Sequence, residues 1–167
     1  MTSTLTQTRM ESPVGELTLL VSDVGLRAIL WPNDREGRVP IPESVSAATH
    51  PILDATIDQL QRYFTDSQAL FDLPLDLVGT EFQTQVWQAL VDIEVGTTET
   101  YGHLADRLNR PNGARAIGSA VGANPVSIVL PCHRVVGANG ALTGFAGGLD
   151  AKRWLLGHEQ DQGKLTL

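Results

Sequence analysis

The sequence predicts an α/β lobe at the N-terminus, with a small antiparallel sheet and one helix, followed by a mostly α-helical C-terminal domain that contains a helix-turn-helix. Three observations support this fold class. Two short strand-like runs precede residue 32, apolar residues recur at helical spacing after Pro51, and two short helical patterns flank a turn at 109–113. A glycine-containing break at 78–80 suggests two domains, 1–78 and 79–167.

The N-terminal lobe is predicted to contain a β-hairpin. A strand at 16–21 is followed by a turn at 23–25 and by a second strand at 26–31, in which apolar residues alternate. The next segment, 32–51, contains four prolines and several charges, and it shows no apolar period. We therefore expect an exposed loop there that serves as a connector.

One amphipathic helix and one edge strand complete the predicted lobe. The helix follows Pro51 and spans about four turns at 3.6 residues per turn. Alternating apolar and polar residues at 71–77 predict a half-buried strand, which Pro74 restricts to the edge because proline cannot donate to a ladder. No catalytic constellation is evident in this lobe. The apolar positions of the helix are Leu53, Ile57, Leu60 and Phe64.

The C-terminal domain is predicted to begin with a helix that has a recognisable start. Thr80 and Gln83, three residues apart, form a capping box. A second, shorter helix is predicted at 101–108, with Thr100 as its N-cap. The apolar stripe of the first of these helices consists of Phe82, Val86, Leu90 and Ile93.

A third helix is predicted at 114–122, after a turn that contains proline and glycine. Two short helices joined in this way are typical of a helix-turn-helix, whose second helix lies in the major groove of DNA. A plain helical hairpin inside a protein core remains an alternative on periodicity alone. The predicted inner face carries Ala114, Ile117 and Val121, and the predicted outer face carries Arg115, Ser119 and Gly122.

The charge distribution permits modest DNA binding and excludes non-specific wrapping. The chain carries a net charge of −7, and phosphate neutralisation dominates affinity for DNA. Residues 1–80 have a net charge of −6, whereas residues 101–134 have a net charge of +3. A small basic face on an acidic body suits salt-sensitive binding.

The composition also bears on compartment and cofactors. One cysteine excludes an internal disulfide and leaves no resolving thiol, which suits a reducing interior. No basic start precedes an apolar core at the N-terminus, and no run approaches the ~18 apolar residues of a membrane span. The four histidines and the cysteine have no metal-ligand spacing. We expect a cytoplasmic protein without a metal.

Cys132 is the first candidate for chemistry. It follows the apolar run 128–130 and Pro131, and it is followed directly by His133 and Arg134. Thiolate is the nucleophilic form, and a free cysteine with a pKa near ~8.5 needs a base or a positive charge nearby to ionise at neutral pH. Because adjacent side chains seldom face each other, a bridging water is expected between Cys132 and His133. An inert, buried cysteine is the alternative.

Six motifs in order accompany this cysteine, and together they resemble the O6-alkylguanine-DNA alkyltransferase family, bacterial type. The resemblance is strong over 80–160 and weak in the N-terminal lobe, for which it implies a ribonuclease-H-like fold. The motifs are Tyr101-Gly-x-Leu-Ala, Arg115-Ala-Ile-Gly, Asn124-Pro125, Pro131-Cys132-His133-Arg134-Val135, Gly144-Phe145-Ala146-Gly147-Gly148 and Trp154-Leu155-Leu156-x-His158-Glu159.

The resemblance implies stoichiometric transfer of an alkyl group from O6-alkylguanine, and by expectation from O4-alkylthymine, to Cys132. The damaged nucleotide is first rotated out of the duplex. Glu159 would orient His133, and His133 would accept the thiol proton through a water. Asn124 would brace the turn that carries Cys132. Arg134 is expected to bind backbone carbonyls rather than substrate.

The resemblance also implies the residues that contact DNA and the base. Arg115 would enter the base stack and Tyr101 would crowd the adjacent phosphate, with Ala114 and Ser119 on the same surface. The implied pocket residues are Val121, Val135, Phe145 and Ala146. Relatives often have tyrosine where this chain has Phe145, which removes a hydrogen-bond donor to the leaving base and predicts slower repair.

The implied partner is double-stranded DNA with O6-alkylguanine, and no cofactor is needed. A monomer is expected in solution, with cooperative assembly on DNA left open. Two other classes of function remain alternatives to the alkyltransferase. One is a DNA-binding regulator in which Cys132 only packs, and the other is a cysteine hydrolase that uses Cys132, His133 and Glu159 in multiple turnovers.

Overall fold

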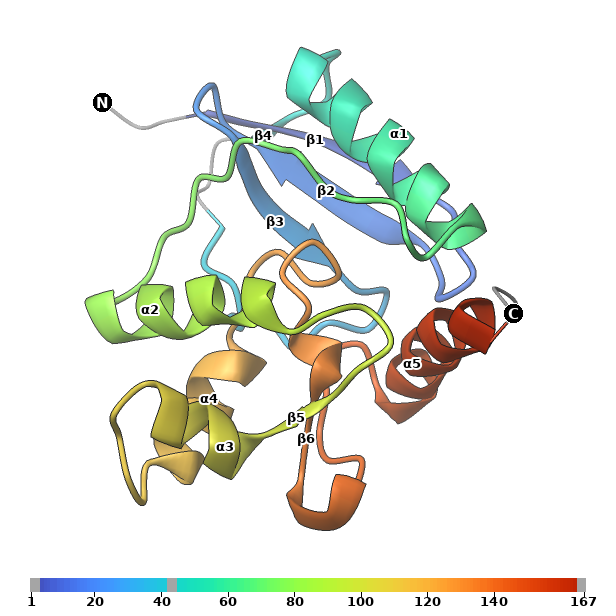
Figure 1. The fold of residues 1–167 in the computed structure, drawn as a ribbon. Helices are drawn as coiled ribbons and strands as arrows, with labels where there is room; N and C mark the ends of the chain where they lie inside the picture. Colours follow the sequence, from blue (N-terminus) through green and yellow to red (C-terminus); the bar gives the residue numbers. More distant parts are fainter. Residues whose placement is uncertain (1–3, 42–44, 165–167) are drawn as a thin grey trace.

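The N-terminal lobe is a four-stranded sheet covered on one face by a helix (Figure 1). The structure is a computed structural model, and it describes residues 4–41 and 45–164. The strand order is β3-β2-β1-β4. Strands β1, β2 and β3 are antiparallel neighbours, but the short β4 pairs with β1 in parallel. The sheet is therefore mixed, whereas an antiparallel sheet was expected. The strands are β1 (Leu5–Met10), β2 (Leu17–Val21), β3 (Leu26–Leu30) and β4 (Val45–Ser46).

The helix α1 (Pro51–Thr65) forms where the apolar spacing predicts it. The side chain of His50 caps its N-terminus by accepting a hydrogen bond from the Ile52 amide at 3.1 Å, and Pro51 occupies the first turn, where no donor is needed. Leu53 and Leu60 are buried against the sheet. Near its C-terminal end, α1 also presents the buried Tyr63 toward the C-terminal domain.

The predicted edge strand at 71–77 is reduced to a single bridge. Leu75 pairs in parallel with Leu26, and the Leu26 amide donates to the carbonyl of Pro74 at 2.8 Å. Pro74 has no amide proton, so the pairing cannot extend through it. The segment thus follows the edge of the sheet without forming a regular strand.

The C-terminal domain is mostly helical, and its first helices begin where the caps predict. The capping box between Thr80 and Gln83 is present, with both hydrogen bonds at 3.0 Å. Thr100 accepts a hydrogen bond from the His103 amide. The elements are α2 (Glu81–Ala89), η1 (Leu90–Asp92), β5 (Glu99–Thr100), α3 (Tyr101–Arg107), α4 (Ala114–Gly122), η2 (Cys132–Arg134), β6 (Val135–Val136), η3 (Ala138–Gly140) and α5 (Leu149–Lys164).

The pair α3 and α4 forms the expected helix-turn-helix. Ile117 and Val121 face the core, whereas Arg115, Ser119 and Gly122 are exposed, as the pattern predicts. Ala114 is only half-buried because it lies in the first turn of α4.

No helix among the described residues is long and apolar enough to cross a bilayer.

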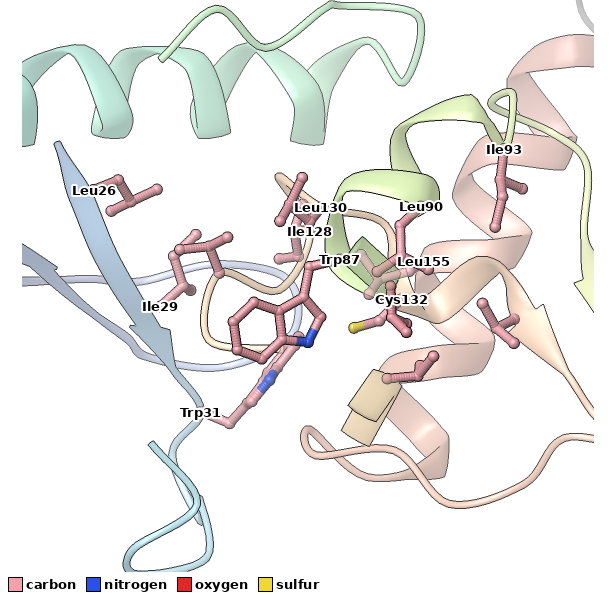
Figure 2. Packing of buried hydrophobic residues seen from close by; sticks show 14 of the residues in the cluster. Leu26, Ile29, Trp31, Trp87, Leu90, Ile93, Ile128, Leu130, Cys132 and Leu155 are labelled. Carbon is pink, nitrogen blue, oxygen red and sulfur yellow. The ribbon is translucent and has the colours of Figure 1, made fainter. Parts of the chain in front are cut away.

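One hydrophobic core joins the two halves of the chain. Figure 2 shows Ile29 and Trp31 of the N-terminal lobe in the same cluster as Trp87 and Cys132. The Ile29 amide donates to the Pro125 carbonyl at 2.8 Å, which ties β3 to the loop after α4. The position of Cys132 therefore depends on both halves of the chain.

Candidate active site

Cys132 lies in the first turn of η2, at the bottom of a very small cavity. Its side chain is 4 % exposed, and its sulfur lies 4.0 Å from Oγ of Ser127. The cavity has a volume of about 10 Å³, which is room for roughly one water molecule. Burial raises the pKa of the thiol, and hydrogen bonding with the side chains of Asn124 and Ser127 offsets this only in part. The resting thiol is therefore protonated at neutral pH.

The loop before Cys132 is held in a strained conformation. Ile128 has a φ of +76°, a region that β-branched residues avoid at a cost of about 1–3 kcal/mol. Asn124 spans the loop: its Nδ2 donates to the Leu130 carbonyl at 2.8 Å, and its Oδ1 accepts from the Val126 amide at 3.1 Å. These two hydrogen bonds fix the segment that places the sulfur.

His133 and Glu159 form a buried pair, which distinguishes them from an ordinary surface ion pair. Their side chains are 0 % and 1 % exposed, and Nε2 of His133 lies 2.7 Å from Oε2 of Glu159. Among the described residues, Nδ1 of His133 has no hydrogen-bond partner. Because Glu159 requires a donor, the geometry favours the tautomer with the proton on Nε2, so that Nδ1 is free to accept one.

Glu159 is ionised and tightly held. Arg134 donates from Nε to Oε1 at 2.8 Å and from Nη2 to Oε2 at 3.0 Å. Burial alone would raise the pKa of Glu159, but the hydrogen bonds and charges of His133 and Arg134 outweigh it and hold that pKa far below its usual value. Burial lowers the pKa of His133 and the Glu159 carboxylate only partly restores it, so the imidazole is neutral at neutral pH.

Arg134 does not contact the sulfur. Its Nη1 donates to the Ile93 carbonyl at 2.6 Å, and the other donors reach Glu159, so Arg134 ties η2 to α5 and to the end of η1. His133 does not contact the sulfur directly either. Among the residues that the structure describes, no hydrogen bond joins the side chains of Cys132 and His133.

Three of the four residues expected at the base pocket, Val121, Phe145 and Ala146, line the small cavity together with Cys132. Tyr101, which was expected at the DNA surface, lines it as well, whereas Val135 is not among the lining residues. Val135 is buried, and both of its main-chain polar groups are engaged: its amide donates to Cys132 and its carbonyl accepts from Lys152 at 2.7 Å.

Two wider cavities adjoin the small one and connect it to the helix-turn-helix. One, of about 520 Å³, is lined by Ser119, Phe145 and Ala146, and the other, of about 870 Å³, by Tyr101, Ala114 and Arg115. Thr143 donates a hydrogen bond to the Tyr101 hydroxyl at 3.0 Å. The sequence-predicted DNA-contacting residues thus line cavities that share wall residues with the small cavity at Cys132.

The basic face is smaller than the sequence suggests. Arg107 is paired with Glu99 at 2.9 Å and Arg134 with Glu159, so two of the four arginines in 101–134 are neutralised. Arg110 stacks over the ring of Phe82. Arg115 is exposed on α4, and no ion pair is seen for it among the described residues. Its charge is therefore available for the expected contact with DNA.

Lys152 was not predicted from the sequence. Its side chain is fully buried, its ammonium donates to the Val135 carbonyl, and it lies 5.9 Å from the centre of the Phe145 ring. Burial lowers its pKa, and interaction with Cys132 opposes this shift. A buried ammonium near the sulfur favours the thiolate once it forms. Lysine on a helix face gives no signal of burial in sequence.

The N-terminal lobe also contributes residues that sequence reasoning missed. The indole of Trp31 donates to Ser127 at 3.2 Å, and its ring meets Phe145 edge-on at a centroid distance of 5.3 Å.

Arg38 is buried, although it lies in the segment predicted as an exposed connector. Residues 42–44 of that segment lie outside the described residues. Arg38 donates to the Asn124 carbonyl at 2.8 Å and pairs with Asp34.

Replacing Arg38 by leucine is expected to destabilise the protein by about 3 kcal/mol, because it leaves the carbonyl groups at the end of α4 without their donor and the carboxylate of Asp34 without its ion-pair partner. The exposed Arg35 in the same turn is the control, and Arg35→Leu should change the free energy of unfolding by less than about 0.5 kcal/mol. Urea unfolding measures both. Equal effects of the two substitutions would contradict a specific role for Arg38.

The fold and the site define a class: a helix-turn-helix protein with a buried cysteine beside a histidine–carboxylate pair. The family models agree with this class. Residues 5–77 match the ribonuclease-like domain of 6-O-methylguanine DNA methyltransferase, and residues 81–161 match its DNA binding domain.

Known relatives extend the match over nearly the whole chain. A methylated-DNA–protein-cysteine methyltransferase of Salmonella typhimurium is 44% identical, covering 93% of this chain and 95% of the relative. That of Mycobacterium bovis is 40% identical, with 95% and 94% covered. The crystal structure of Mycobacterium tuberculosis OGT in complex with DNA superposes with a TM-score of 0.84 at 38% identity, with 95% and 94% covered. The chain belongs to the 6-O-methylguanine DNA methyltransferase family.

Proposed function

We propose that this protein repairs DNA by direct reversal, transferring the alkyl group of O6-alkylguanine in double-stranded DNA irreversibly to its own Cys132. The observation that carries the proposal is the position of Cys132 beside the buried His133–Glu159 pair, in a cavity that shares Tyr101 with the wider cavity lined by Arg115 of the helix-turn-helix. Membership of the family supports it.

The reaction needs one proton acceptor and one nucleophile. Nδ1 of His133 takes the thiol proton through a bridging water, and Glu159 stabilises the imidazolium that results. Sγ then forms a bond to the alkyl carbon while the carbon–O6 bond breaks, and the electron pair of that bond stays on guanine. The proton lost by the thiol balances the one that guanine takes up. The thioether has no route to hydrolysis, so each molecule acts once.

The base must leave the duplex to reach the sulfur, because Cys132 is buried. We assign Arg115 to fill the space in the base stack, and Tyr101 to crowd the neighbouring phosphate, with Ala114 and Ser119 along the backbone. The 10 Å³ cavity at Cys132 is far smaller than a purine, so we assign the approach of the base to the adjoining cavity of about 520 Å³, which Phe145 and Ala146 also line. O4-alkylthymine is a second substrate under the same proposal.

The proposal includes the organisation and location of the protein. We divide the chain into two domains, 1–78 and 79–167, and the separate family models for 5–77 and 81–161 support this division. The single cysteine, which must stay reduced to act, suits the cytoplasm. The protein acts as a monomer, with assembly on DNA open to measurement.

The proposal is tested by incubating the protein with a duplex that contains O6-methylguanine and mapping the modified peptide by mass spectrometry. One methyl group per chain is expected on Cys132, and none on the Cys132→Ser variant. An unmodified Cys132 in the intact protein would overturn the proposal. Multiple turnover with regenerated thiol would favour a hydrolase, and operator binding that survives Cys132→Ser without transfer would favour a regulator.

Phe145→Tyr is expected to accelerate transfer by up to ~100-fold, because the added hydroxyl can donate to the leaving base at the wall of the pocket. Single-turnover kinetics with the methylated duplex measure the rate. Phe82→Tyr, on α2 and outside the cavities near Cys132, adds the same hydroxyl and should leave the rate unchanged. An unchanged rate for Phe145→Tyr means that the leaving base obtains its proton elsewhere.

A further inference from the structure

The hydroxyl of Tyr63 reaches the proposed catalytic carboxylate from the other half of the molecule. It donates to Oε2 of Glu159 at 2.6 Å, and both side chains are 1 % exposed. Tyr63 lies on α1, which is otherwise the helix that covers the sheet, and Glu159 lies on α5 (Figure 1). This contact is a direct polar link from the N-terminal lobe to the machinery around Cys132.

The link is anchored at a second point. Nε2 of His158, the neighbour of Glu159, lies 2.7 Å from the main-chain carbonyl of Tyr63, and the two rings meet edge-on. Trp154 stacks on the other side of His158 at a centroid distance of 4.7 Å. The position of the Tyr63 hydroxyl relative to α5 is therefore fixed by packing as well as by its own hydrogen bond.

Tyr63 can only donate in this arrangement. Burial, together with the charge and hydrogen bond of Glu159, raises the pKa of Tyr63 far above its usual value, so the hydroxyl keeps its proton. Oε2 of Glu159 accordingly receives three donors, from Tyr63, His133 and Arg134. Each additional donor withdraws negative charge from the oxygen that faces the imidazole.

We propose that Tyr63 is a positioning residue for alkyl transfer: by sharing the Oε2 atom of Glu159 with His133, it fixes the carboxylate and keeps the imidazole neutral, with Nδ1 ready to accept the thiol proton. The inference rests on the proposed role of His133 as the base. The titratable and charged groups around His133 and Glu159 are Arg134, Lys152 and Tyr63, and His158 packs against Tyr63. Of these, Tyr63 alone comes from the N-terminal lobe.

Tyr63→Phe tests the inference by removing one oxygen atom. With one donor fewer, Glu159 binds the protonated imidazole more strongly, so the pKa of His133 rises. The acid limb of the rate profile should move to higher pH by about one unit, since the carboxylate that loses one donor binds the imidazolium more strongly. At pH values on that limb transfer slows by up to ~10-fold, whereas the alkaline plateau changes little.

Thr56→Val is the matched control. Thr56 is fully buried on the same helix, and its hydroxyl donates to the Ile52 carbonyl without reaching the site. This variant also loses one buried hydroxyl, so it should share the loss of stability and leave the pH profile unchanged. If both variants shift the profile equally, or if Tyr63→Phe does not shift it, Tyr63 has a structural role only.

Two further measurements keep the test decisive. Imidazole NMR of the unreacted protein follows the titration and tautomer of His133 without any transfer, and it should report a higher pKa in Tyr63→Phe. If that variant does not fold, a fluorinated tyrosine at position 63, a stronger donor, should lower the pKa of His133 instead; no change overturns the inference. If the wild-type protein never becomes methylated on Cys132, the proposed function is wrong. If the wild type transfers normally but the pKa of His133 is the same in Tyr63→Phe, only this inference is wrong.

Discussion

Replacing Glu159 by glutamine is expected to destabilise the protein by about 3–5 kcal/mol, because it leaves the largely buried guanidinium of Arg134 without a counter-charge. The amide also cannot accept from all the donors that now converge on the carboxylate, which include Tyr63 and His133. Denaturant unfolding at neutral pH measures the loss.

The same substitution should nearly abolish alkyl transfer, because His133 loses both its orientation and the charge that stabilises its protonated form. Asp76→Asn is the control: Asp76 also accepts from an arginine, Arg27 at 2.8 Å, but it lies at the edge of the sheet and not at the site. That variant should be somewhat less stable and transfer at the normal rate. Wild-type transfer by Glu159→Gln would contradict the assigned base.

The pH dependence of this stability has a definite sign. The pKa of Glu159 is depressed in the folded state, so its contribution is fully present above its unfolded value of about 4.5 and is lost as pH falls toward the folded value. The difference in stability between the wild type and Glu159→Gln should therefore be constant near neutrality and shrink below about pH 4.

Replacing Arg115 by alanine is expected to slow transfer from duplex DNA on the order of 100-fold and to leave the stability of the protein unchanged. Arg115 is exposed, so its removal opens no cavity. Extruding a stacked nucleotide costs a few kcal/mol, and each 1.4 kcal/mol is a factor of ten, so losing the side chain that fills the stack has a large effect.

A comparison of substrates identifies the cause of the Arg115 effect. Transfer from a single-stranded oligonucleotide should be much less affected, because no duplex stack has to be opened. Arg62→Ala, an exposed arginine on α1, removes the same charge and should leave both rates unchanged. An equal loss on single-stranded and duplex substrates would show that Arg115 contributes through charge alone.

The elements that could be predicted from the sequence are those with local causes. The capping box of Thr80 and Gln83, the apolar period of α1 and the Thr100 cap act over a few residues, and each helix begins where these signals place it. Strand β1 had no such signal, because three polar residues and an arginine fill its centre and it is held by pairing on both sides.

The candidate site divides in the same way. Cys132, His133 and Glu159 could be predicted because they belong to ordered motifs. Arg38 and Lys152 could not, because an arginine in a proline-rich segment and a lysine on a helix resemble surface residues until the fold provides their carbonyl partners. The supporting contacts to the site are long-range, and no local pattern encodes them.

The narrowness of the cavity over Cys132 has a consequence for the lifetime of the protein before it meets damage. A molecule that reacts only once is wasted if peroxide or a soluble electrophile consumes its sulfur first. A protonated thiol that is 4 % exposed, in a space for one water, reacts slowly with both. The burial that requires the damaged base to enter the protein thus also protects the unreacted thiol from oxidation and from alkylation by small molecules.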